Sequence, residues 1–233
     1  MKVAYFHGAG HTELGGLHLL LLKIRADVTW ERCFPAGRKP GGKYRRPEPA
    51  PSDQGATGAD LVLRAQARLR DHAERGESFD AYVIVDDWDC RSGGDDATEP
   101  LADAMVAWEQ RLTRALAAVA DRPTTALFAS PEIEAWFLVS VALRRRWLGD
   151  AEHAVRVAID CPFDQVEHFG GRGVRGACEH KLSSRVAEAL QLAGRRYSKA
   201  IDGADLVGDL DPDELAARLP ATVGRAVRQI RGA

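Results

Sequence analysis

A run of five apolar residues that ends in three carboxylates constrains the fold of this chain most strongly. Residues 81–85 have the sequence Ala-Tyr-Val-Ile-Val, and Asp86, Asp87 and Asp89 follow them. The apolar run is typical of a buried strand, and acids gathered at its end are costly unless a cation meets them. Since ligands bind at the carboxyl ends of the strands in open α/β sheets, the run predicts both this fold class and a metal site.

A second acidic pair follows the next predicted strand, at residues 125–129. Pro131 comes first and is expected to begin a helix, because its fixed φ suits that position. Glu132 and Glu134 then lie in the first turn, where the helix dipole favours negative charge for structural reasons alone. Side chains two residues apart on a helix point in different directions, so we expect Glu132, which is nearer the strand, to face the crevice.

Predicted strands and helices alternate along the chain. Strands are expected at residues 3–6, 28–33, 81–86 and 125–129. One helix is expected to end near residue 24, and two more to cover residues 59–74 and 101–119. This order indicates an α/β fold with a mostly parallel sheet and helices on both faces. We expect an α/β core at residues 1–147 and a helical C-terminal extension at 148–233, which packs on the core and ends in one amphipathic helix over residues 215–230.

Charge and cysteine content exclude several classes of protein. The chain of 233 residues has a formal charge of −2, so any contact with nucleic acid must be local. Its four cysteines form no CxxC motif, and the spacing of Cys161, His168, Cys178 and His180 fits no compact zinc pattern, so neither disulfides nor zinc are expected. No export or membrane segment is evident, which predicts a cytoplasmic protein.

A basic loop is the local feature that suits nucleic acid. Residues 34–58 are rich in Pro, Gly and Arg and show no periodicity, which predicts a long loop. The cationic side chains of this loop suit contacts to a phosphate backbone, and Tyr44 between them could stack on one base. A solvated loop would have the same composition. The candidate nucleic-acid-binding residues are Arg38, Lys39, Lys43, Arg45 and Arg46.

Magnesium chemistry accounts best for the acids. Mg²⁺ takes oxygen ligands, usually one or two carboxylates with water and substrate phosphate. Asp87 and Asp89 can share one face of an extended strand and bind one ion, with Asp86 as a competitor for the first ligand position. His7, at the end of the first strand, is a candidate ligand or general base, or a structural residue. The glycine-rich turn at residues 7–16 matches no nucleotide-binding motif and carries one further acid, Glu13.

Four segments in order resemble the DUF4276 proteins, which are Toprim-like and related to the RloB and OLD-type nucleases. They are the FHGAGHT stretch at 6–12, DDWD at 86–89, PEIEAWFL at 131–138, and RYSK at 196–199 ahead of LDPD at 210–213. The resemblance spans most of the chain. It implies a Toprim-like core and Mg²⁺- or Mn²⁺-dependent phosphodiester chemistry on DNA or RNA. It also implies that the protein functions with an AAA/ABC-type ATPase partner in bacterial defence against phage.

The same resemblance assigns roles and leaves one conflict. By position, Asp87 and Asp89 are the metal-binding DxD, and Glu132 or Glu134 is a further acid of the site. Toprim enzymes place a glutamate at the end of the first strand, where an ungapped reading of this chain has His7. A shifted frame lets Glu13 match a later acid but does not restore that glutamate. One hypothesis is an active nuclease in which His7 orients or deprotonates water. The others are a catalytically weakened interaction subunit that partners an ATPase, and a small-molecule phosphotransferase or phosphohydrolase.

Overall fold

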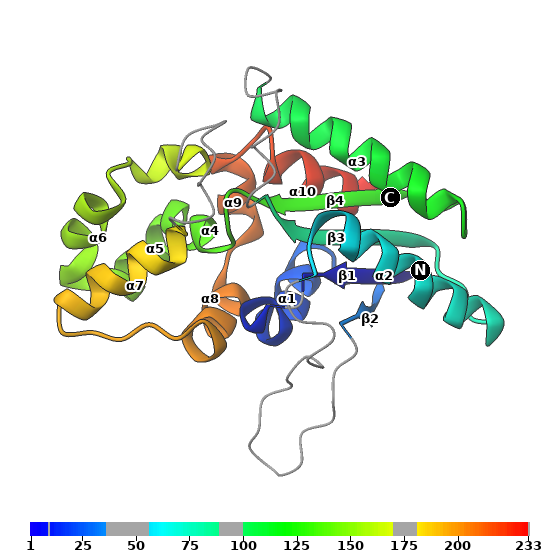
Figure 1. Ribbon diagram of the computed structural model, residues 1–233, viewed down its shortest axis with the longest axis horizontal. Helices are drawn as coiled ribbons and strands as arrows, with labels where there is room; N and C mark the ends of the chain where they lie inside the picture. Colours follow the sequence, from blue (N-terminus) through cyan, green and yellow to red (C-terminus); the bar gives the residue numbers. More distant parts are fainter. Residues whose placement is uncertain (9, 36–55, 89–99, 170–180, 233) are drawn as a thin grey trace, which may run out of the picture.

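The sheet of this protein is entirely parallel in the part of the chain that the structure describes. A computed structural model describes residues 1–8, 10–35, 56–88, 100–169 and 181–232 (Figure 1). Its four strands are β1 (Lys2–His7), β2 (Thr29–Phe34), β3 (Ala81–Asp87) and β4 (Thr124–Ala129), in the order β2-β1-β3-β4. The predicted α/β class and parallel sheet are therefore confirmed, and the strands fall within two residues of their expected bounds.

Helices cover both faces of the sheet. Helix α1 (His11–Ile24) packs on the face that carries Val3 and Tyr5, whereas α2 (Gly58–Glu74) and α3 (Leu101–Ala117) pack on the face of Ala4 and Phe6. The change of side follows from the strand order, because right-handed crossovers that run in opposite directions along a sheet leave their helices on opposite faces. The direction changes between β1 and β3, which places a ligand-binding crevice at the carboxyl ends of these two strands.

A group of short helices lies beyond the carboxyl edge of the sheet, toward which the strand arrows point in Figure 1. These are α4 (Glu134–Val139), α5 (Val141–Leu148), α6 (Glu152–Ile159) and α7 (Leu182–Leu192), with 3-10 turns at Gly149–Ala151 and Phe163–His168. The expectation that Pro131 begins the helix was wrong. The first turn-type hydrogen bonds go to the carbonyls of Glu132 and Ile133, so residues 131–133 form a turn and the helix begins at Glu134.

The C-terminal segment returns to the sheet. A π-helical turn at Lys199–Gly203 leads into α8 (Ala204–Asp209), which packs along α1. The approach is close, since a Cβ on Gly16 would lie 2.1 Å from the carbonyl oxygen of Ala204. Glycine at this position therefore allows α8 to dock, and the docking carries the preceding residues to the carboxyl edge of the sheet.

The expected single C-terminal helix is in fact two helices, α9 (Pro212–Arg218) and α10 (Val223–Gly232). Leu219 leaves the helical conformation with φ −123° and ψ 59°, and Pro220 has no N–H with which to continue the helix. The apolar positions that suggested one helix are nevertheless all buried, in a core shared by α1, α8 and the sheet. None of the described helices is long and apolar enough to cross a membrane.

Candidate metal centre

Five carboxylates converge at the carboxyl edge of the sheet, from β3, from α1 and from the turn that leads into α4. Glu132 and Glu134 are 2% and 0% exposed, Glu13 and Asp86 are also buried, and Asp87 is partly exposed. They lie close enough to repel one another, since burial first and then the charges of the other four carboxylates raise the pKa of Asp87. The structure thus joins acids that stand far apart in the sequence.

Strand alternation separates Asp86 from Asp87. Asp86 points to the α2 face, where its Oδ2 accepts a hydrogen bond of 2.9 Å from the backbone N–H of Gly58, the first residue of α2. Asp87 is on the same side of β3 as Val83 and Val85, and therefore faces α1. Asp86 already has a structural partner, so Asp87 is the better placed of the two to bind a cation with the other acids.

Both Glu132 and Glu134 face this site, although we expected only Glu132 to do so. The spacing argument fails because Glu132 precedes the helix and is not bound by helical geometry. Glu132 Oε2 accepts a hydrogen bond of 2.8 Å from the backbone N–H of Ser183. Glu134 Oε1 accepts one of 2.9 Å from the hydroxyl of Tyr197, and both glutamates approach Lys199 Nζ, at 3.3 and 3.4 Å.

Lys199 and Tyr197 are site residues that the chemistry of the sequence did not indicate. Each is more than 60 residues from its glutamate partner, and the only signal was their place in the RYSK segment. Burial lowers the pKa of Lys199, but the neighbouring carboxylates of Glu134, Glu132 and Asp87 raise it by more, so the ammonium stays charged. Burial and the neighbouring Glu134 raise the pKa of Tyr197, which therefore remains a hydrogen-bond donor.

One lysine does not neutralise this cluster. The pKa of Glu13 is raised to about 7. Burial is the main cause, the backbone N–H of Glu13 itself opposes the rise, and the neighbouring Glu134 adds to it. Burial also raises the pKa of Asp87 and of Glu134, with repulsion from the neighbouring carboxylates as a further cause. The buried Oε2 atoms of Glu13 and Glu134 have no hydrogen-bond partner among the described residues. Hard oxygen donors with spare negative charge are the ligands that Mg²⁺ and Mn²⁺ take.

Gly10 makes room for one of these carboxylates. A Cβ at this position would lie 2.0 Å from Glu13 Oε2, because the side chain of Glu13 folds back over the start of α1. The glycine-rich turn after β1 therefore serves the acidic cluster, and this accounts for a motif that matches no nucleotide-binding fingerprint.

His7 is buried at the end of β1. Its Nδ1 lies 2.6 Å from the carbonyl oxygen of Gly8 and donates to it, which leaves Nε2 as the acceptor atom. Burial lowers its pKa to about 3, so the imidazole is neutral. Such a weak base suits a ligand or acceptor role better than proton abstraction. Nε2 has no hydrogen-bond partner among the described residues.

Several predicted site residues lie outside the described residues. Asp89, the second acid of the expected DxD pair, is one of them. The same holds for the whole predicted nucleic-acid-binding set, Arg38, Lys39, Lys43, Arg45 and Arg46. The roles given to these residues stay predictions.

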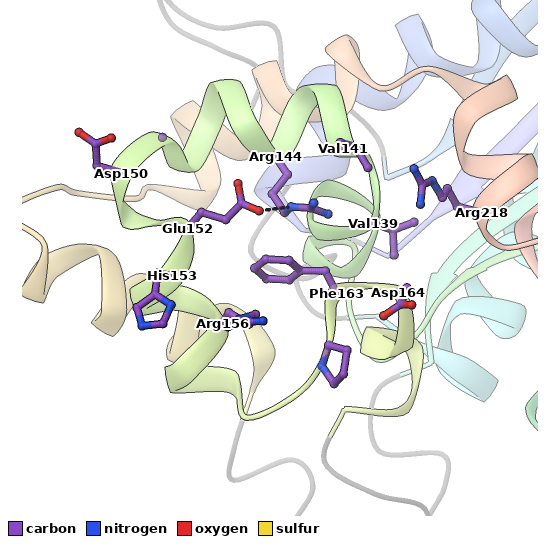
Figure 2. A pocket seen from close by; sticks show the side chains of 12 residues that line it. Val139, Val141, Arg144, Asp150, Glu152, His153, Arg156, Phe163, Asp164 and Arg218 are labelled. Carbon is purple, nitrogen blue, oxygen red and sulfur yellow. Dashed lines mark hydrogen bonds and ion pairs between the residues drawn. The ribbon is translucent and has the colours of Figure 1, made fainter.

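A cavity of about 680 Å³ lies apart from the acidic cluster, among α4, α5, α6 and Arg218 of α9 (Figure 2). Arg144 lines this cavity. Its guanidinium carbon lies 4.4 Å from the ring centre of Phe163, and its Nε lies 3.1 Å from Glu152 Oε1. None of the five clustered acids lines this cavity. The cavity and the candidate metal centre are therefore separate features.

Comparisons with protein-family models, with curated proteins and with solved structures found no match. A functional assignment therefore rests on the geometry of this chain and on the motifs in its sequence.

Proposed function

We propose that this protein is a Mg²⁺- or Mn²⁺-dependent, Toprim-like nuclease that hydrolyses phosphodiester bonds in DNA or RNA. The observation that carries the proposal is the acidic cluster at the switch point of the sheet, where Glu13 and Glu134 each keep a buried, unpartnered oxygen. Such groups are costly unless a cation binds them. A divalent ion fits this donor set, in which Asp87 is the only partly exposed member.

The residues divide into those that hold the ion and those that hold its ligands. Asp87 and Glu134 are assigned as metal ligands, together with Asp89 from the sequence pattern. Tyr197 orients Glu134 through its hydrogen bond of 2.9 Å, and Ser183 fixes Glu132. When bound, the metal neutralises phosphate charge and makes water a stronger nucleophile.

Two further groups suit the hydrolysis itself. Glu13 has a pKa of about 7, which is matched to accepting a proton from water at neutral pH. Lys199 carries a positive charge at the edge of the cluster and is 44% exposed, so its ammonium would be able to turn to a phosphate oxygen if a metal took over the charge of the glutamates. His7 Nε2 can accept a hydrogen bond from water or serve as a ligand.

The biological setting rests on the motif resemblance alone. The DUF4276-like segments support a role in bacterial anti-phage defence, in the cytoplasm, with nucleic acid as substrate and an AAA/ABC-type ATPase as partner. The basic loop that contains Arg38 to Arg46 is assigned to the phosphate backbone.

A specific observation favours a second candidate, a catalytically weakened interaction subunit that partners such an ATPase. Strand β1 ends in His7, with a pKa of about 3, where Toprim enzymes carry a glutamate. Lys199 also already forms ion pairs with two of the acids. In this candidate the ammonium of Lys199 is the permanent cation of the cluster, no metal binds, and the cluster has a structural role.

Cleavage assays separate the two candidates. Supercoiled plasmid, linear duplex, single-stranded DNA and RNA are incubated with the protein and Mg²⁺ or Mn²⁺. We expect metal-dependent cleavage that falls at least about 100-fold in Asp87→Asn, since even outer-shell changes cost 10–100-fold. The control is Asp103→Asn, an exposed acid in the first turn of α3. Cleavage that survives in Asp87→Asn contradicts the site, and a wild-type protein that neither binds the metal nor cleaves favours the second candidate.

A further inference from the structure

Three different kinds of metal ligand meet between the edge strand β2 and helix α2. Glu31 and Cys33 are two residues apart on β2 and share its α2 face, and His72 comes from the last turn of α2. One ligand atom from each lies within 4.8 Å of the other two. His72 is at the opposite end of α2 from Gly58, roughly 20 Å away by the helical rise, so this group is distinct from the acidic cluster.

The ligand types indicate which metal fits. A thiolate, an imidazole and a carboxylate suit Zn²⁺ and related transition ions, and they do not suit Mg²⁺. With bonds of about 2.0–2.3 Å, ligand atoms on a tetrahedron lie about 3.5 Å apart, so the three side chains need to close by about 1 Å. Glu77 Oε2 lies 2.7 Å from His72 Nδ1, where it accepts a hydrogen bond and orients the imidazole, as carboxylates beside metal-binding histidines do.

Lys2 lies beside the carboxylates of this group. Its ammonium lies 2.8 Å from Glu31 Oε2 and 3.9 Å from Glu77 Oε2, and so it balances the charge of both carboxylates. The side chain is 36% exposed and can turn into solvent when another cation binds. Cys33 is a free, buried thiol, whose pKa burial and Glu31 raise to about 12, so it becomes a thiolate only when a metal displaces its proton.

We propose that Glu31, Cys33 and His72 bind one zinc-class ion, which pins the edge strand β2 to helix α2. The proposal is independent of the nuclease assignment, because it shares no residue with the acidic cluster. A metal here joins two consecutive elements whose ligand residues are distant in sequence, Glu31 and Cys33 on β2 and His72 at the end of α2, so it stabilises the folded state in which its ligands are brought together.

Cobalt titration tests this site directly, because a thiolate bound to Co²⁺ gives a charge-transfer absorption band that carboxylates alone do not give. We expect the full-length protein to develop this band with one Co²⁺ per chain, to lose it when Zn²⁺ is added, and to unfold at a higher temperature with Zn²⁺. Cys33→Ser should abolish the band, and His72→Gln should weaken binding at least about tenfold.

The matched control is Cys161→Ser, which removes another free cysteine and should leave the band unchanged. A wild-type protein without the band overturns the proposal, and so does a band that persists in Cys33→Ser. Circular dichroism checks that each variant is folded. If Cys33→Ser does not fold, His72→Gln decides, because its side chain is partly exposed, and unchanged Co²⁺ affinity in this variant overturns the proposal.

Discussion

Replacing Glu13 by Gln should stabilise the metal-free protein at alkaline pH. Burial and the neighbouring Glu134 raise the pKa of Glu13 from 4.5 to about 7, against the opposing effect of its own backbone N–H. A carboxyl whose pKa is raised by folding contributes stability below its unfolded pKa, and this stability is lost as pH rises through the folded value. Glutamine keeps the shape of the side chain and cannot ionise, so the variant does not undergo this loss.

The pKa of Glu13 sets the size of the effect. A rise from 4.5 to about 7 corresponds to about 3 kcal/mol of unfolding free energy once both states are ionised. Between about pH 5 and pH 8 most of this is lost, so the difference between Glu13→Gln and wild type should grow by about 2 kcal/mol. For a chain of this length, that corresponds to a melting-temperature gain about 4–8 °C larger at the higher pH.

Urea denaturation with a chelator at the two pH values measures this difference. Glu188→Gln, an exposed glutamate on α7, is the control and should show no pH-dependent gain. Addition of Mg²⁺ should reduce the advantage of the variant, because a bound cation offsets the charge that Glu13 adds to the cluster in wild type. A Glu13→Gln gain that is equal at both pH values, or a loss that is equal at both, refutes the reasoning that Glu13 is a strained buried charge.

Two further predictions concern the segment that completes the site. Lys199→Met leaves the charges of Glu132 and Glu134 without their ion-pair partner and should destabilise the metal-free protein by about 1–3 kcal/mol, less than a fully buried pair because the lysine is 44% exposed. Thermal unfolding should show a larger Mg²⁺ stabilisation than in wild type, and an equal one would argue against a shared site. Gly16→Ala places a Cβ 2.1 Å from the carbonyl oxygen of Ala204 and should cost about 1–3 kcal/mol in denaturant unfolding. An unchanged midpoint would mean that the contact between α1 and α8 is not tight.

The sheet was predictable because its signals are local. Apolar runs at the four strands, with helical periodicity between them, determine an alternating α/β order, and a right-handed crossover rule then limits the topology. The acids after β3 and β4 could be assigned to one edge of the sheet for the same reason. Asp87 and Glu134 needed no knowledge of the three-dimensional structure to be named as candidates.

The parts that sequence reasoning missed depend on long-range packing. Lys199 and Tyr197 reach the acids only because α8 docks on α1, and nothing in their own neighbourhood signals a charged site. The break between α9 and α10 is an exception, because Pro220 signals it locally and the prediction followed the apolar periodicity instead. Glu132 was placed on a helix that begins two residues later, because the proline signal was stronger than the turn that follows it.

Calorimetric titration of Mg²⁺ and Mn²⁺ tests the central claim most directly. The wild-type protein, Asp87→Asn and the exposed control Asp103→Asn are titrated at neutral pH, with and without a non-hydrolysable oligonucleotide to supply substrate phosphate. The account predicts saturable binding by wild type and the control, weakened at least about tenfold in Asp87→Asn. Equal binding in all three proteins, or no binding to wild type even with the oligonucleotide, would contradict a metal centre at this edge of the sheet.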